Sequence, residues 1–184
     1  MQQVKGAVLK SRLTFVEKQF GKAAVPRVLG RLGPDDQAAL RLVLSVVWYP
    51  FALGERLDQA IMAELGKGDA RFFERLGEAS ATQNLSTVHK SYVVPGDPHA
   101  FLEKAPQIYR SYYEGGRREY TRHGPTSGEL TTYDAESFSA PDCQTIVGWH
   151  RKALEMCGAR NIVVVESECR ARGGRVCRYR VSWE

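Results

Sequence analysis

The last quarter of the chain carries the pattern that most limits the fold. Residues 139–142 read Ser-Ala-Pro-Asp, which is typical of a helix N-terminus, and an apolar stripe follows until Gly158. A β-branched run over 162–165 comes next, and after Gly173-Gly174 the residues 177–183 alternate between apolar and polar. The pattern predicts one helix followed by two antiparallel strands that are joined near the glycine pair.

Four residues of this region have side chains that bind metal ions. Cys143 lies in the first turn of the predicted helix, Glu166 lies near the end of the first strand, and Cys169 and Cys177 flank the glycine pair. Three thiolates and a carboxylate can form a tetrahedral Zn²⁺ site. The helix dipole would favour the thiolate form of Cys143. In strict alternation Glu166 and Cys169 point to opposite faces, so the strand must bend between them.

Two other interpretations of the cysteines stay open at this point. Free cysteines are commonly buried as small apolar residues, and all four, including Cys157, could fill the core in their reduced form. A crosslink between Cys169 and Cys177 is the third interpretation, although disulfides are rare in a reducing compartment.

The rest of the chain reads as mainly helical, with apolar residues at helical spacing and Gly or Pro at the boundaries. Helices are expected over residues 16–24, 34–47, 53–65, 69–88 and 105–114. The helix over 69–88 carries Gly77, where a second backbone could approach closely. Strands are expected over 129–134 and near 4–9. The fold class is therefore α+β, with a helical N-terminal majority packed on a small, mostly antiparallel sheet.

Composition fits one globular domain spanning residues 1–184, with the zinc-motif region over about 140–184. The chain has 184 residues, is 43% hydrophobic and 26% charged, and has a net charge of +5. Its start lacks the apolar segment of a signal peptide. The apolar stretch from 42 to 53 is interrupted by Pro50 and is shorter than the roughly 20 residues that span a bilayer. We interpret it as a buried helix and expect a cytoplasmic protein.

The cysteine-rich region also resembles a known family. The string Cys143-Gln-Thr-Ile-Val-Gly-Trp149, followed by Glu166-Ser-Glu-Cys-Arg-Ala171 and by Gly173-x-x-x-Cys177-Arg178, resembles the signature of the 4-vinyl reductase (4VR) domain. It is most similar to that domain in the effector-sensing modules of phenol- and xylene-responsive activators. The resemblance implies one structural Zn²⁺, held by the residues that match the four ligands of that family: Cys143, Glu166, Cys169 and Cys177. Cys157 has no counterpart and is expected in the core.

The wider superfamily extends these expectations. It includes haem-based nitric-oxide sensors and vesicle-tethering (TRAPP) subunits, so the resemblance implies a TRAPP-like helix-and-sheet fold that dimerises. Haem sensors of this superfamily carry a Tyr-x-Ser-x-Arg motif, and residues 109–113 here read Tyr-Arg-Ser-Tyr-Tyr, which argues against haem. The whole chain also resembles a paralogous family of gliding, fruiting-body-forming bacteria, which implies no biochemical role.

Catalysis is not expected. The chain has four histidines, of which His89 and His150 lie on predicted helical faces, while His99 and His123 are expected at the surface. The sequence contains no nucleophile elbow, P-loop, dinucleotide-binding glycine pattern or zinc-protease motif.

Ligand binding is expected to involve aromatic residues. The aromatic-sensing relatives hold their effectors in a pocket between helices and sheet, and the candidate lining residues are Trp48, Tyr49, Phe51, Phe101 and Trp149. Aromatic residues near helix ends are also ordinary core residues. Tyrosines and arginines interleave over 109–122, as in surfaces that bind nucleic acid, but Glu114 and Glu119 dilute that patch. A nucleic-acid partner is therefore not expected.

The sequence thus predicts a non-enzymatic regulatory module that is stabilised by zinc, forms a homodimer and senses a small aromatic or apolar ligand. A regulatory protein partner would receive the signal. The alternative is a protein–protein assembly or scaffold module, like the vesicle-tethering subunits, that binds no small ligand.

Overall fold

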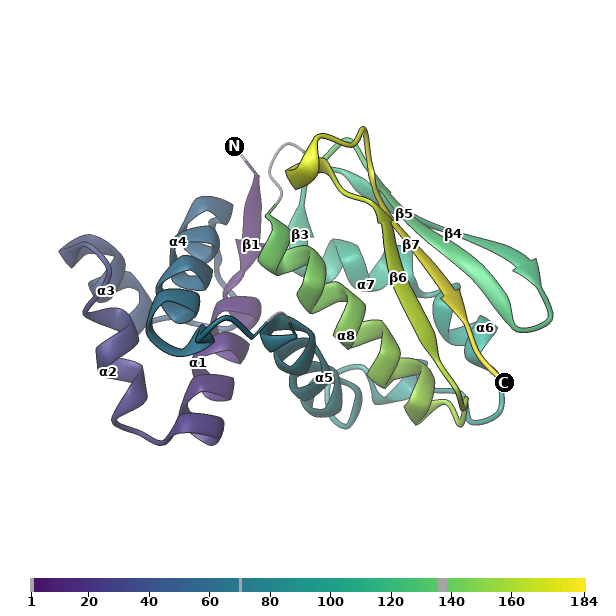
Figure 1. The fold of residues 1–184 in the computed structure, drawn as a ribbon, viewed down its shortest axis with the longest axis horizontal. Coiled ribbons are helices and arrows are strands. Elements are labelled where there is room, and N and C mark those ends of the chain that lie inside the picture. Colours follow the sequence, from purple (N-terminus) through teal and green to yellow (C-terminus); the bar gives the residue numbers. More distant parts are fainter. Residues whose placement is uncertain (1, 70, 136–138) are drawn as a thin grey trace.

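The computed structural model describes residues 2–69, 71–135 and 139–184, and it has two lobes (Figure 1). The N-terminal lobe is made of α1 (Gly6–Phe20), α2 (Ala24–Leu29), α3 (Pro34–Arg41), α4 (Phe51–Ile61) with its π-helical continuation Met62–Gly66, and a small sheet of β1 (Gln3–Lys5), β2 (Trp48–Pro50) and β3 (Tyr113–Glu114). The strand order in this sheet is β2-β1-β3, and both pairings are antiparallel. The first strand of the chain thus pairs with a strand that begins more than a hundred residues later.

The C-terminal lobe contains the larger sheet, whose strand order is β4-β5-β7-β6 with every pairing antiparallel. Its elements are α5 (Phe72–Leu85), the 3₁₀ turn Lys90–Tyr92, α6 (Pro98–Leu102), α7 (Ala105–Tyr112), β4 (Arg117–Gly124), β5 (Ser127–Tyr133), α8 (Ala140–Met156), β6 (Val163–Glu168), the 3₁₀ turn Arg170–Arg172 and β7 (Cys177–Ser182). Helices α6, α7 and α8 lie on one side of the sheet (Figure 1). The α+β class and the antiparallel sheet are confirmed.

Helices α5 and α8 hold the two lobes together. A Cβ atom at Gly148 of α8 would lie 1.8 Å from the carbonyl oxygen of Glu74, and one at Gly77 of α5 would lie 2.0 Å from that of Thr145. Only glycine therefore permits this backbone contact at either position. The expectation that Gly77 marks a close approach is confirmed. Helix α5 contributes Phe72 and Leu76 to the core of the N-terminal lobe and Leu85 to that of the C-terminal lobe.

The predicted helix and hairpin at the end of the chain are present. The hydroxyl of Ser139 accepts a hydrogen bond from the backbone N–H of Asp142 at 3.1 Å, which caps α8. Strands β6 and β7 pair antiparallel, and their register shifts between Glu166 and Glu168. This β-bulge is the bend that the positions of Glu166 and Cys169 require.

Three predicted elements are wrong. The helix expected over 16–24 is divided, because α1 ends at Phe20 and α2 begins at Ala24. The helix expected over 34–47 ends at Arg41, and Leu42 and Val46 beyond it are 78% and 77% exposed, so the apolar stretch is not a buried helix. The backbone N–H groups of Gly6 and Ala7 donate to the carbonyls of Val47 and Ser45, and these hydrogen bonds hold the segment beside the start of α1 instead. The strand expected near 4–9 is limited to β1, because the helix begins at Gly6.

Strand β4 was not anticipated. Its mixture of arginine and tyrosine is similar to that of a nucleic-acid-binding surface, but the strand pairs with β5 along the edge of the sheet. No helix in the described residues is long and apolar enough to cross a membrane.

Candidate functional site

A cavity of about 60 Å³ lies between the two lobes, which we call the interlobe cavity. Its walls come from α1, α5, α7, β3, β4 and α8, and the residues that line it are Val8, Arg12, Ser80, Asn84, Ala105, Ile108, Tyr109, Tyr112, Tyr113, Arg118, Thr145, Ile146, Trp149 and His150. The lining combines aliphatic side chains and aromatic rings with a few polar groups, which is the usual character of a small-molecule site.

The structure places the five predicted aromatic lining residues in different surroundings. Trp149 lines the interlobe cavity, and its ring lies 5.9 Å from that of Phe101, which is fully buried behind it. Phe51 lies in the core of the N-terminal lobe and reaches only two smaller cavities. Trp48 and Tyr49 belong to β2, where Lys5 packs on the Trp48 ring and the Tyr49 hydroxyl accepts a hydrogen bond from the Leu44 backbone. Of the five predicted residues only Trp149 lines the cavity, and its other aromatic rings come from Tyr109, Tyr112, Tyr113 and His150.

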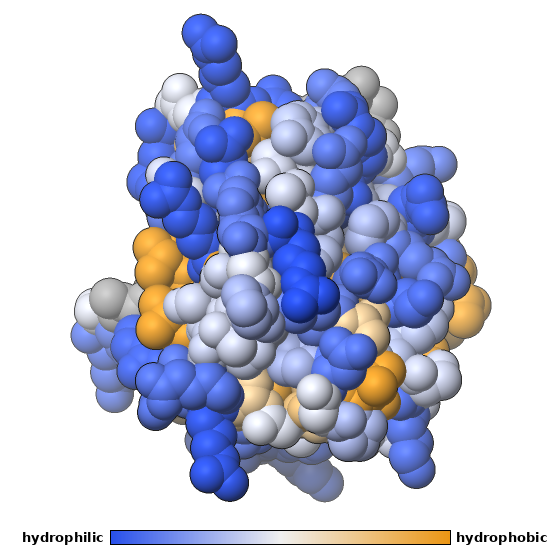
Figure 2. Space-filling model, turned by 90° about the vertical axis from the view of Figure 1, so that its right-hand side faces the viewer, coloured by the Kyte–Doolittle hydropathy of each residue, from blue (hydrophilic) through white to orange (hydrophobic). Residues whose placement is uncertain are grey.

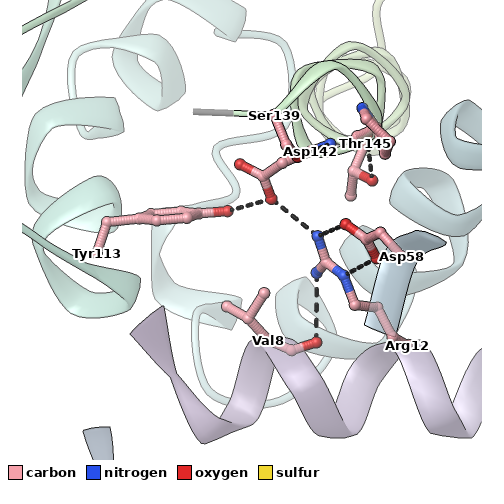
Figure 3. Close-up of polar contacts among 8 residues, drawn as sticks. Val8, Arg12, Asp58, Tyr113, Ser139, Asp142 and Thr145 are labelled. Atoms are coloured by element: carbon pink, nitrogen blue, oxygen red, sulfur yellow. Dashed lines mark hydrogen bonds and ion pairs between the residues drawn. The ribbon is translucent and has the colours of Figure 1, made fainter. Parts of the chain in front are cut away.

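A buried network of charged side chains reaches the cavity through Arg12 and Tyr113 (Figure 3). Arg12 of α1 is 3% exposed and forms a bidentate pair with Asp58 of α4, at 2.6 Å and 3.0 Å. The same guanidinium donates to Asp142 of α8 at 2.8 Å. The hydroxyl of Tyr113 donates to the same Asp142 oxygen at 3.0 Å. The network therefore ties α1 and α4 of one lobe to the start of α8.

Burial controls the ionisation of this network. Desolvation raises the pKa of Asp58 to about 6, although Arg12 opposes the rise. Burial, followed by the charge of Asp142, raises the pKa of Tyr113 well above its usual value. Tyr113 therefore remains a hydrogen-bond donor at neutral pH.

Arg118 of β4 faces the same cavity without a carboxylate partner. It is 7% exposed, and its Nε donates to the Thr132 hydroxyl at 3.0 Å. Its guanidinium carbon lies 4.9 Å from the centre of the Tyr109 ring and 5.8 Å from that of Tyr179. Among the described residues, neither Nη nitrogen has a hydrogen-bond partner and no acid lies within ion-pair distance. Arg118 is thus a buried cation stabilised by rings and one hydroxyl.

His150 of α8 also reaches the cavity. Its Nδ1 lies 2.9 Å from the Ile146 carbonyl oxygen, which can only accept, so Nδ1 carries the proton. Burial, followed by the charge of Arg118, lowers the pKa of His150 to about 3. The imidazole is therefore neutral over the physiological range.

The four predicted metal ligands lie together at the same end of the sheet as Arg118, because Thr132 of β5 pairs with Arg118 on one side and with Cys177 on the other. Ligand atoms of Cys143, Glu166, Cys169 and Cys177 all lie within 4.8 Å of one another. The Cys143 sulfur is 3.6 Å from that of Cys177 and 3.8 Å from that of Cys169. Sulfurs bound to one tetrahedral Zn²⁺ at ~2.3 Å would be about 3.8 Å apart. Cys157 lies in the core outside this cluster.

Glu166 has a carboxylate oxygen that lacks a partner. The side chain is 3% exposed, and Oε2 accepts hydrogen bonds from Gln144 and Arg172. Oε1 is buried and accepts no hydrogen bond from any described residue. A buried oxygen of this kind costs free energy unless a donor or a cation compensates it.

The thiols of the cluster titrate as a group. Hydrogen bonds to Cys169 and Cys177, together with burial, raise the pKa of Cys143. The hydrogen bond with Cys143 lowers the pKa of Cys177 to about 7. Without a metal, the thiolate is therefore favoured at Cys177, and the helix dipole does not make Cys143 the most acidic thiol.

Sequence reasoning missed several of these residues. Arg12, Asp58 and Asp142 are far apart in sequence and form no motif. The mixture of arginine and tyrosine over 109–122 was the one sequence signal for this region, but it indicated an exposed surface and not the wall of a cavity. His99 is also not at the surface: its two ring nitrogens lie 2.6 Å from the Tyr120 hydroxyl and 2.7 Å from the Pro125 carbonyl oxygen.

Comparison with known proteins gives a family and a fold. The sequence model of the family described as "Protein of unknown function (DUF2378)" matches residues 54–184. No curated protein matches the chain. Similar solved structures include the Fe(II) unliganded H-NOX protein from K. algicida, with a TM-score of 0.73 and 15% identity over 98% of this chain and 96% of that one.

Two further H-NOX structures have a similar fold over the same length of the chain. An oxygen-binding H-NOX domain related to soluble guanylate cyclases has a TM-score of 0.71 and 14% identity, and it covers 98% of this chain and 95% of its own. The H-NOX protein from S. oneidensis in the Fe(II)NO state has a TM-score of 0.71 and 15% identity, with 98% and 99% coverage. At this identity the similarity establishes the fold alone.

The resemblance to the 4VR domain is wrong. The matching family is DUF2378, and the fold is that of H-NOX domains and not the expected 4VR/TRAPP-like one. The short cysteine strings suggested a family that neither comparison supports. The four side chains nevertheless converge, and that geometry does not depend on the family assignment.

Proposed function

The chain belongs to the DUF2378 family, and we propose that it is a non-enzymatic regulatory module that senses a small ligand in the interlobe cavity. The observation that carries this proposal is the position of the cavity, whose walls come from both lobes. A ligand that contacts α1 on one side and β4 and α8 on the other would change the relative free energy of different lobe arrangements. Two structures with the same fold hold small molecules, an oxygen-binding H-NOX domain and an H-NOX protein in the Fe(II)NO state, which supports this proposal.

The chemistry of the lining supports binding and not catalysis. As far as the structure describes it, the cavity lining contains no thiol and no carboxylate. His150 is neutral with its proton on Nδ1, and among the described residues no lining hydroxyl donates a hydrogen bond to it. The pairing of nucleophile and base that covalent catalysis needs is therefore absent from these residues.

Haem does not fit this cavity. One similar structure, 13% identical, concerns haem redox potential and porphyrin distortion. The interlobe cavity has a volume of about 60 Å³, whereas pockets for drug-sized ligands have roughly 300–1,000 Å³. The rings of Tyr109, Tyr113 and Trp149 occupy the space around it. A porphyrin would need all of these side chains to move, so the proposed ligand has only a few heavy atoms.

A ligand screen with a cavity-filling variant tests the sensor proposal. We expect a small molecule to raise the thermal midpoint of the protein, because binding to the folded state alone stabilises it. Ala105→Leu fills the cavity from α7, and it should abolish the shift. Ala79→Leu adds the same volume on the exposed face of α5 and should leave the shift unchanged. A shift that persists in Ala105→Leu would place the ligand elsewhere.

We propose a structural zinc ion as the second component. The sulfur separations of 3.6 Å and 3.8 Å match a tetrahedral site, and the orphaned Glu166 Oε1 would gain the cation that its burial requires. Three thiolates and a carboxylate leave no open coordination position, so the ion would stabilise the fold and take no part in chemistry. It would join the start of α8 to the β6–β7 hairpin.

Metal analysis tests the zinc site. We expect about one Zn²⁺ per chain, and Cys169→Ser should lower both the zinc content and the thermal midpoint. Cys157→Ser removes a buried thiol outside the cluster, so it should keep the zinc while losing some stability. A metal-free protein with an unchanged midpoint would refute the site.

The remaining parts of the proposal concern location and assembly. Four free cysteines and a thiolate zinc site suit a reducing compartment such as the cytoplasm. A homodimer and a regulatory protein partner would convert occupancy into a signal. A scaffold without a ligand is the alternative, and a large apolar surface would favour it. The end of the molecule that carries the C-terminus is mainly hydrophilic, with apolar side chains in separate small patches (Figure 2), so this end offers no such surface.

A further inference from the structure

We infer that the interlobe cavity binds a short-chain monocarboxylate, whose carboxylate pairs with Arg118 and whose alkyl tail packs on the aliphatic and aromatic wall. This inference rests on the proposed function and names the class of ligand. Its starting point is a charge that the described chain leaves uncompensated. Arg118 is 7% exposed and lines the cavity, and no described carboxylate pairs with it.

A buried guanidinium without an anion is costly, because desolvation removes its interaction with water. The Tyr109 ring at 4.9 Å and the Thr132 hydroxyl offset part of this cost. The two Nη nitrogens remain without partners among the described residues. Two parallel N–H donors match the two oxygens of a carboxylate in a bidentate pair.

The polar groups around Arg118 favour an anion over a neutral ligand. Burial raises the pKa of Tyr112 to about 12, so its hydroxyl stays protonated and can donate. Its hydroxyl has no hydrogen-bond partner in the described chain. The second arginine of the cavity, Arg12, is already neutralised by Asp58 and Asp142. Arg118 is therefore the cation that an incoming anion would meet.

Size and wall chemistry select the kind of anion. A volume of about 60 Å³ is a few times the roughly 10–15 Å³ that one water needs in a cavity, so the ligand has few heavy atoms. Val8, Ile108 and Ile146 present apolar surface to the same space. An alkyl tail gains from contact with that surface, whereas an inorganic oxyanion would desolvate against it. Acetate and propionate fit both conditions.

Titration of the full chain with matched ligands tests the inference. The probes are propionate, its neutral isostere propionamide, and nitrate, each followed by calorimetry and by the NMR signals of the His150 ring. We expect propionate to bind and shift the His150 signals, and propionamide and nitrate to bind roughly 10- to 100-fold more weakly, the effect of losing one charge-assisted interaction or the apolar contact.

Two variants of one strand provide the control. Arg118→Met should weaken propionate binding by a similar roughly 10- to 100-fold. Arg122→Met makes the same change in charge at an exposed position of β4 and should leave binding unchanged. Circular dichroism of Arg118→Met checks that it is folded, and the comparison of propionate with propionamide on the unmodified protein needs no variant.

The outcomes separate this inference from the proposed function. Propionamide that binds as well as propionate, or propionate binding that survives Arg118→Met, overturns the monocarboxylate assignment and leaves a sensor of neutral ligands. Failure of every probe in this set also overturns the assignment. The sensor proposal fails only if, in addition, no compound of the wider screen gives a shift that Ala105→Leu abolishes.

Discussion

Arg12 and Arg118 are two buried arginines that line one cavity, and their surroundings are opposite. Arg12 is surrounded by two carboxylates and the carbonyl of Val8 in its own helix, and the two carboxylates join α1 to α4 and to α8. Arg118 has tyrosine rings and one threonine hydroxyl around it. Both are less than one-tenth exposed, so burial alone does not determine how a charge is compensated.

The difference shows how a stable interior can still contain a binding site. The network around Arg12 is saturated, because its bonds run to partners that the fold itself supplies (Figure 3). The Arg118 site is incomplete within the described chain, and an incomplete site has affinity left for a ligand. The first arrangement joins α1 and α4 to α8, and the second is where we propose that the ligand binds.

The comparison predicts its largest effect for substitutions of the two arginines themselves. Arg12→Met leaves Asp58 and Asp142 buried without a cation, and it should lower the free energy of unfolding by about 3–5 kcal/mol. Arg118→Met leaves no buried carboxylate without a cation. It should therefore lower the free energy of unfolding by less than about 1 kcal/mol, or raise it. Urea unfolding at pH 7 measures both values. Equal losses for the two variants would contradict the contrast.

Local patterns explain why one half of the site could be predicted from the sequence. The Ser139 cap, the glycine pair and the alternation in β7 each depend on neighbouring residues, and they place Cys143, Glu166 and the hairpin cysteines near one another. The bend in β6 followed from the same reasoning, since two ligands on one strand had to face one way. Whether the cluster binds zinc remains a prediction.

Long-range contacts explain why the interlobe cavity and its arginines could not be predicted from the sequence. Arg12 meets Asp58 across 46 positions and Asp142 across 130, and no periodicity encodes either pair. Residues 42–47 have helical spacing of apolar residues, but their hydrogen bonds to the start of α1 prevent the helix from continuing. Likewise, the sequence around Arg118 resembles a basic surface. The side chain is buried because β4 pairs with β5 in the sheet, and no local pattern indicates that pairing.

A smaller effect is expected from removing the hydroxyl that supports Arg118. Thr132→Val keeps the shape of the side chain but removes the acceptor for Arg118 Nε, which should cost about 1.5–3 kcal/mol because the donor is charged and buried. Thr121→Val, at an exposed position of β4, serves as the control. Thermal unfolding of both variants measures the difference. A Thr132→Val protein as stable as the control would mean that the tyrosine rings alone hold the guanidinium.

The smallest effect at neutral pH concerns His150, which is uncharged there. Its pKa in the folded protein is lowered to about 3 from an ordinary value near 6.5, so its neutral form stabilises the fold above about pH 6.5, and this contribution is lost as the pH falls toward 3. Asp58 acts in the opposite direction, since its raised pKa of about 6 makes the fold more stable as the pH falls from 6 toward 4.

The charge of Arg118 is the second cause of the lowered pKa of His150, after burial. Arg118→Met should therefore raise that pKa and reduce the stability lost between pH 6.5 and 4, while the Asp58 contribution stays common to both proteins and cancels in the difference. Thermal midpoints measured across this range, with Arg122→Met as the control for net charge, should show that Arg118→Met alone loses less stability on acidification than the unmodified protein. Parallel curves for all three proteins would show that the uncompensated charge does not reach His150, and the contrast between the two arginines would then be one of packing and not of electrostatics.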